Sequence, residues 1–140
     1  YFLEDGPANK PMQMLQELVS FVLNEYPVKK DQVYVGGLSM GGMGAFELVR
    51  RMPKIFAAAF PICGGANPAT AKTMKKVDWW VFHGGKDDVV PPIHSEKMVA
   101  ALKNAGAKVQ FTLYPNANHN SWDSAFAEPG LLPWLFSRHK

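Results

Sequence analysis

The sequence predicts an α/β fold in which a mostly parallel sheet is covered by helices. Segments with helical and strand-like patterns alternate along the 140 residues, and parallel strands need crossover connections, which are usually helical. The expected strands are apolar on both faces, which is typical of a sheet buried between helices. A chain of this length supports one domain, so residues 1–140 are expected to form a single α/β domain.

The first third of the chain predicts the order helix, strand, helix. Residues 11–26 carry apolar side chains at a spacing of three and four, with Pro11 suited to a first helical turn and Pro27 to its end. Residues 32–38, QVYVGGL, are short, β-branched and aromatic, and predict a strand. Residues 40–52 then predict a second amphipathic helix.

The rest of the chain continues this alternation. Three further buried strands are expected at residues 56–63, 79–84 and 108–115. Residues 93–106 predict a helix that ends at Gly106, because glycine favours the position after a helix. The tail from Ser121 to Arg138 is expected to be helical on both sides of a break at Pro129-Gly130.

Composition excludes several classes of function. Hydrophobic residues make up 47% of the chain and charged residues 19%, which is typical of a globular protein. The net charge of +3 comes from scattered basic residues, so no basic face for nucleic acid is expected. The single cysteine, Cys63, excludes an internal disulfide and is not expected to support a cysteine-based metal site. No segment approaches the roughly 18 apolar residues of a membrane span.

A serine between glycines follows the first expected strand. Ser39 lies in Gly37-Leu38-Ser39-Met40-Gly41, which fits the pattern G-x-S-x-G. In that pattern a strand turns sharply into a helix, and the residues two positions away from the serine are expected to be small. The backbone N–H of Met40, at the start of the helix, is the expected donor to an oxyanion. Ser39 is therefore a candidate nucleophile.

Two further candidates follow later strands. Asp87 comes after the strand at 79–84, and His119 lies in a polar loop after the strand at 108–115. The carboxyl ends of parallel strands meet at one edge of a sheet, where sites form. A serine nucleophile needs a base to take its proton and a carboxylate to hold that base in one tautomer. The chain order Ser39, Asp87, His119 supplies these three groups.

Other residues near these candidates are given different roles. Asp88 is the competing acid, and His83 is expected to be a structural hydrogen-bonding residue. Trp122 is the candidate for a substrate-binding side chain. A metal site drawn from His83, Asp87, Asp88 and His94 lacks a recognised ligand spacing, so neither a metal nor an organic cofactor is expected.

Three motifs carry a family resemblance. The segments GGLSMGG, HGGKDDVVP and YPNANHNSW resemble the nucleophile elbow, acid turn and histidine loop of α/β-hydrolase esterases. The nearest groups are the phospholipase/carboxylesterase, dienelactone-hydrolase-like and feruloyl-esterase-like proteins. Their H-G-x-x-D-x-x-V-P pattern implies that Asp87, and not Asp88, is the acid. The resemblance implies a serine carboxylesterase that hydrolyses small-molecule esters through an acyl-enzyme, and it slightly favours a secreted or periplasmic location.

The resemblance covers only the carboxyl-terminal half of the family fold, strands five to eight of eight. In the family, a loop after the third strand gives the second oxyanion N–H, and nothing before Ser39 resembles that loop. The strand at 32–38 would then lie at an exposed sheet edge. We therefore expect that an amino-terminal part is absent from this sequence, or that another chain completes the sheet.

Two alternatives remain open at this point. The serine motif and the order of Ser39, Asp87 and His119 also resemble those of peptidases of the prolyl-oligopeptidase type. The chain could also be a non-catalytic binding or assembly module whose site is incomplete.

Overall fold

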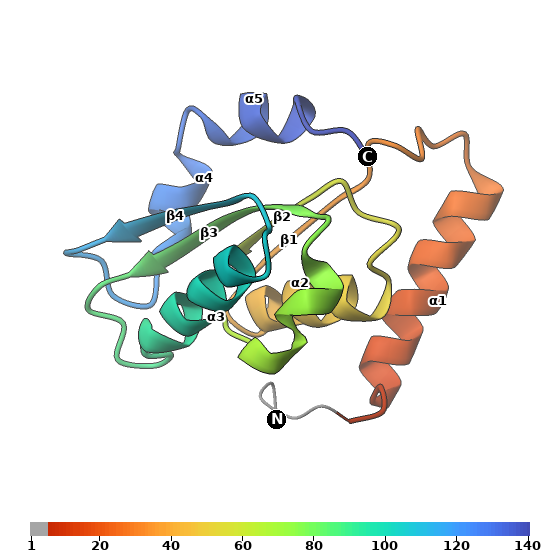
Figure 1. Cartoon of the computed structure of the whole chain (residues 1–140). Coiled ribbons are helices and arrows are strands. Elements are labelled where there is room, and N and C mark those ends of the chain that lie inside the picture. Colours follow the sequence, from red (N-terminus) through yellow and green to blue (C-terminus); the bar gives the residue numbers. More distant parts are fainter. Residues whose placement is uncertain (1–5) are drawn as a thin grey trace.

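A four-stranded parallel sheet forms the centre of the molecule (Figure 1). The computed structural model describes residues 6–140. The strands lie in the order β1-β2-β3-β4, and every neighbouring pair is parallel. They are β1 (Tyr34–Leu38), β2 (Ala58–Ile62), β3 (Asp78–Gly84) and β4 (Val109–Tyr114). The α/β class expected from the alternating pattern is confirmed.

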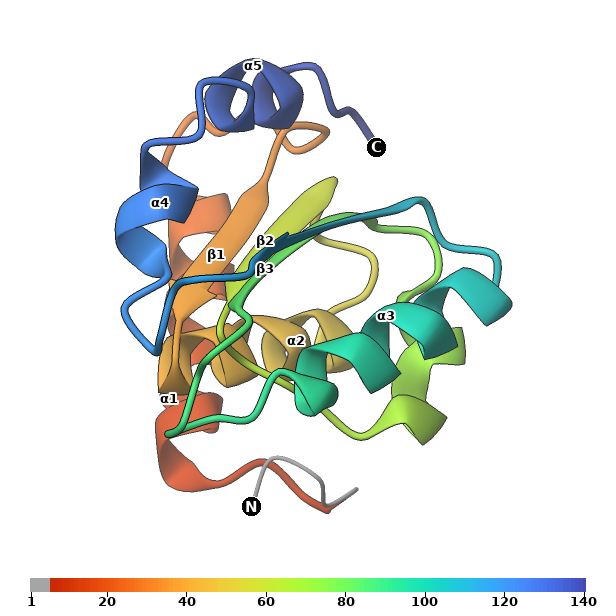
Figure 2. The same ribbon diagram turned by 90° about the vertical axis from the view of Figure 1, so that its left-hand side faces the viewer.

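Helices follow each strand and cover both faces of the sheet, as the two views in Figures 1 and 2 show. The α-helices are α1 (Lys10–Glu25), α2 (Met40–Arg51), α3 (Ile93–Asn104), α4 (Trp122–Phe126) and α5 (Leu131–Phe136). A 3₁₀-helix, η1 (Pro68–Met74), was not expected from the sequence. It begins at Asn67, whose side chain accepts a hydrogen bond from the N–H of Ala69, and it is too short to show a helical period.

The two faces of the sheet pack against separate hydrophobic clusters. Along β3, Trp79 and Val81 face the cluster beneath α2 and α3, whereas Trp80 and Phe82 face the cluster beneath α4 and α5. This alternation follows from the two-residue period of a strand. Trp79 is fully buried and stacks on Phe46 of α2 with ring centroids 5.0 Å apart. Both faces are therefore packed, as expected for a parallel sheet.

Close approach of α2 to the sheet depends on glycines at particular positions. A Cβ on Gly37 would collide with the carbonyl oxygen of Gly41, and one on Gly42 would lie 2.5 Å from the carbonyl oxygen of Ile62. The expectation that Gly41, two residues after Ser39, must also be small was wrong, because a Cβ there would meet no atom within 4 Å, and the same is true of Gly44. A Cβ on Gly36 would also collide with the ring of Phe60, so the steric need falls on Gly36 and Gly37 before Ser39 and on Gly42 after it.

The predicted amphipathic helix forms as α1, but most of its apolar stripe is exposed. Met14, Leu18 and Phe21 are 59%, 55% and 55% exposed, and α1 contacts the rest of the described chain mainly through α2. Strand β1 lies at the edge of the sheet, as expected from the sequence. The hydrophobic period identified the apolar face of the helix, but within residues 6–140 little packs against it.

None of the helices formed by residues 6–140 is both long enough and apolar enough to cross a membrane.

Two glycine variants test the packing of α2. Gly42→Ala should lower the free energy of unfolding by about 1–3 kcal/mol, because the added methyl group overlaps the backbone of Ile62. Gly44→Ala, two residues along the same helix, should leave stability unchanged or raise it by up to about 1 kcal/mol. Urea unfolding of both variants measures this difference, and equal effects would contradict the described approach of α2 to β2.

Candidate active site

Ser39 lies on a strained turn between β1 and α2. Its backbone φ is 54° and its ψ is −118°, and Cys63 is the other non-glycine residue with positive φ among residues 6–140. Positive φ is costly for a residue with a side chain and is often found at functional sites. The N–H of Ser39 donates to the carbonyl oxygen of Ile62 at 2.9 Å, which ties this turn to the end of β2.

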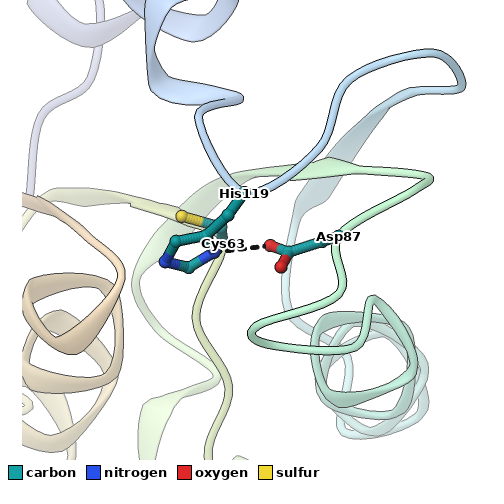
Figure 3. A group of neighbouring side chains, drawn as sticks. All are labelled: Cys63, Asp87 and His119. Atoms are coloured by element: carbon teal, nitrogen blue, oxygen red, sulfur yellow. Dashed lines mark hydrogen bonds and ion pairs between the residues drawn. The ribbon is translucent and has the colours of Figure 1, made fainter.

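A continuous hydrogen-bonded chain joins Ser39, His119 and Asp87. Ser39 Oγ lies 2.8 Å from His119 Nε2, and His119 Nδ1 lies 2.8 Å from Asp87 Oδ2. The imidazole is therefore held between the hydroxyl and the carboxylate, and Figure 3 shows its contact with Asp87. Because a carboxylate can only accept, Nδ1 carries the proton and Nε2 is free to accept from the serine hydroxyl.

The carboxylate of Asp87 is buried and fully hydrogen-bonded. Its Oδ1 accepts from the N–H groups of Val89 and Val90 at 3.0 and 2.8 Å. Its Oδ2 lies 2.8 Å from His119 Nδ1 and 3.2 Å from His83 Nε2. Burial alone would raise the pKa of Asp87, but hydrogen bonds from His119, Val90 and Val89 outweigh it and hold the pKa below its ordinary value. The carboxylate is thus charged at neutral pH.

Backbone and amide contacts join the loop of Asp87 to the loop of His119. The side chain of Asn118 accepts from the N–H of His119 at 2.7 Å and from that of Asp88 at 3.2 Å. The N–H of Lys86 donates to the carbonyl oxygen of Ala117 at 2.9 Å. Sequence reasoning missed Asn118, because a polar residue in a loop gives no signal of what it joins.

The remaining candidates lie as follows. The Asp88 side chain is exposed, and it is Asp87 that contacts His119. Trp122, the first residue of α4, packs edge-on against the His119 ring with centroids 5.4 Å apart. Met40 is the first residue of α2, where a backbone N–H has no partner within the helix. Its side chain is 74% exposed.

Cys63 lies beside the Asp87–His119 pair, at the end of β2 (Figure 3). The three residues offer potential ligand atoms within 4.8 Å of one another. No motif in the sequence indicated that Cys63 would lie here. Two features disfavour a metal at this position. His119 and Asp87 are already bonded to each other and to other groups, and burial raises the pKa of the Cys63 thiol, so the thiolate that a metal prefers is disfavoured.

The fold and this edge of the sheet define the class of protein. A parallel sheet with a serine on a strained turn between strand and helix, followed by an acid and a histidine after later strands, is typical of the α/β-hydrolase fold. A family model described as Phospholipase/Carboxylesterase matches residues 4–128. The chain belongs to this family.

Individual relatives are consistent with this assignment. The chain is 29% identical over 101 residues to a bifunctional acetylxylan esterase/xylanase of Neocallimastix patriciarum, covering 71% of the chain and 14% of that protein. It is 25% identical to lysophospholipase-like protein 1 of Mus musculus, covering 79% of the chain and 48% of that protein. The solved structure of a thermostable esterase is 32% identical to the chain, with a TM-score of 0.90. The match covers 98% of this chain and 39% of the esterase. The chain thus spans less than half the length of these proteins.

Replacing the buried carboxylate should change how stability depends on pH. The pKa of Asp87 is lower in the folded protein than the ordinary value of about 3.9, so the folded state favours the charged form. That stabilisation is fully present above the ordinary value and is lost as the pH falls through the folded pKa. Asp87→Asn should therefore lower the free energy of unfolding at pH 7, with the deficit shrinking as the pH falls below about 4.

Urea unfolding at a series of pH values measures this effect. The matched control is Asp88→Asn, which changes an exposed carboxylate and should stay within about 0.5 kcal/mol of the unmodified protein. A deficit for Asp87→Asn that is the same at every pH would contradict the account.

Proposed function

We propose that this chain carries the catalytic centre of a serine carboxylesterase, with Ser39 as nucleophile, His119 as general base and Asp87 as the orienting acid. The observation that supports this proposal most strongly is the unbroken chain of 2.8 Å contacts from Ser39 Oγ through His119 to Asp87 Oδ2. Membership of the phospholipase/carboxylesterase family supports an ester as the substrate. In this proposal the single domain acts on a small-molecule carboxylic ester and needs no cofactor.

The first half of the reaction acylates Ser39. His119 Nε2 takes the hydroxyl proton while Ser39 Oγ forms a bond to the carbonyl carbon of the ester. Asp87 stabilises the imidazolium that results, since its carboxylate is charged and lies 2.8 Å from Nδ1. The tetrahedral intermediate collapses as the bond to the alcohol oxygen breaks, and His119 donates its proton to that oxygen. The alcohol leaves, and an acyl group remains on Ser39.

The second half returns the enzyme to its starting state. A water molecule gives its proton to His119 Nε2 and attacks the acyl carbonyl carbon, and the bond to Ser39 Oγ breaks as that oxygen regains a proton. The product is a carboxylic acid. The Trp122 indole contacts the His119 ring at nearly right angles, with ring centroids 5.4 Å apart, and so lies beside the general base. We therefore assign substrate binding to Trp122.

The oxyanion of both intermediates needs backbone donors. The N–H of Met40 is the donor that this chain supplies, because it is at the amino end of α2 directly after the nucleophile. We infer that the second donor comes from polypeptide outside residues 6–140. One such donor is typically worth about 2.7–4 kcal/mol of barrier lowering.

The same outside polypeptide would also cover an exposed surface. Strand β1 is an edge strand, and α1, which precedes it in the chain and contacts α2, exposes Met14, Leu18 and Phe21. Edge strands and apolar helix faces left in water promote association. We propose that a preceding segment of the same polypeptide pairs with β1 and packs on this face of α1.

Blocking the nucleophile tests the proposed mechanism. Ser39→Ala should abolish both ester hydrolysis and labelling by a fluorophosphonate probe, with a loss of activity on the order of 10⁴-fold or more. The control Ser20→Ala removes an exposed hydroxyl on α1 and should keep both. Hydrolysis retained by the Ser39 variant would contradict the mechanism.

A second comparison distinguishes an esterase from a peptidase. The rates of hydrolysis of an activated ester and of a proline amide are measured at equal substrate concentration.

Intact mass and one charged variant test the completed sheet. The protein from its natural source should have a denatured mass above 15.5 kDa, and Leu18→Glu should destabilise it because a charge would enter an apolar contact. Glu17→Gln on the neighbouring exposed position is the control. A larger mass under native conditions alone would instead indicate a second chain. A 15.5 kDa monomer that tolerates Leu18→Glu would contradict the proposal.

A further inference from the structure

We propose that His83 is a positioning residue for this reaction, whose Nε2–H fixes Asp87 in the orientation that His119 requires while Ser95 holds the His83 ring from its other side. The inference rests on the proposed function, because His83 would act on the reaction only by orienting Asp87, the acid of the proposed mechanism. His83 is completely buried at the end of β3, and its two ring nitrogens bond to Ser95 and to the carbonyl oxygen of Val90.

The proton on Nε2 follows from the neighbours of this atom. His83 Nε2 lies 2.8 Å from the carbonyl oxygen of Val90 and 3.2 Å from Asp87 Oδ2. A carbonyl oxygen and a charged carboxylate can only accept hydrogen bonds. If Nε2 carried no proton, three buried acceptors would face one another, which is costly. Nε2 is therefore protonated and donates to the carbonyl oxygen of Val90, and Asp87 Oδ2 lies 3.2 Å from the same nitrogen as a longer electrostatic contact.

Ser95 makes the neutral form of the ring possible. His83 Nδ1 lies 2.7 Å from Ser95 Oγ, and this hydroxyl is also 2.8 Å from the carbonyl oxygen of Gly64. Burial lowers the pKa of His83, outweighing the opposite effects of Val90 and Asp87. In the neutral ring with its proton on Nε2, Nδ1 accepts from the hydroxyl of Ser95, which can point to Nδ1 because a serine hydrogen rotates freely.

A neutral donor suits this position better than a charged one. Asp87 Oδ2 then faces N–H groups from two different elements: it accepts from His119, in the loop after β4, and lies 3.2 Å from Nε2 of His83 on β3. Together with the backbone donors on Oδ1, they fix the plane of the carboxylate. A positive charge on His83 would compete with the imidazolium of His119 for the same carboxylate. With a neutral His83 ring, the negative charge of Asp87 stabilises only the imidazolium that forms on His119 during the reaction.

The state of the His83 ring is measured by long-range ¹H–¹⁵N NMR of the intact protein labelled at histidine nitrogens. We expect a neutral His83 with its proton on Nε2 at neutral pH, in a molecule that need not turn over substrate. A charged ring, or a proton on Nδ1, would overturn the proposal. This result is independent of esterase activity, so a failure of the proposed function is recognised separately.

Two substitutions at one position separate positioning from packing. His83→Gln keeps an N–H donor at a similar distance from the backbone, whereas His83→Leu removes it. We expect His83→Leu to lower kcat by about tenfold or more with little change in KM, because the misplaced carboxylate affects the transition state more than substrate binding. His83→Gln should recover most of that loss.

Folding and a histidine control complete the test. Each variant is checked by its unfolding transition, and the Nδ1 proton resonance of His119 is followed because it reports the bond to Asp87 directly. That resonance should shift in His83→Leu and remain near its original position in His83→Gln. The control His139→Leu removes an exposed histidine near Asp31, beside the amino end of β1, and should change neither quantity. Equal losses of kcat in the Gln and Leu variants, or an unmoved His119 resonance in both, would overturn the proposal.

Discussion

A buried negative charge at Asp87 is the constraint on which the rest of the site depends. A carboxylate out of contact with water is stable only when its oxygens are hydrogen-bonded. Here the N–H groups of Val89 and Val90 donate to one oxygen, and His119 Nδ1–H donates to the other, which also lies 3.2 Å from His83 Nε2. The loop after β3 must therefore fold tightly around this side chain, and the loop after β4 must bring His119 to it.

The parallel sheet makes this meeting possible. Ser39 follows β1, Asp87 follows β3 and His119 follows β4, so residues 80 and 32 positions apart in sequence contact one another at one edge. The two loops are then joined by the backbone of Lys86 and the side chain of Asn118. The strained backbone of Ser39 is maintained by its bond to β2 and by the glycine that lets α2 approach. The packed sheet thus stabilises a local geometry that an isolated turn would not adopt.

The sequence was sufficient for the strands and for the location of Ser39, Asp87 and His119, because buried strands leave continuous apolar runs and parallel strands place their ends together. It could not show what covers α1, since a hydrophobic period identifies an apolar face but not its partner. Nor could it place Cys63 beside the histidine. That contact depends on how far the neighbouring strands extend. The pairing between strands determines this length, and the local sequence does not.

The most direct test of the central claim is to trap the acylated protein. The intact protein would be mixed rapidly with 4-nitrophenyl acetate, quenched in acid during the first turnover and mapped by peptide mass spectrometry. We expect an initial release of nitrophenolate equal in amount to the protein, together with an acetyl group on Ser39. Hydrolysis that proceeds with no acyl group on Ser39, or with the acyl group on another residue, would contradict it.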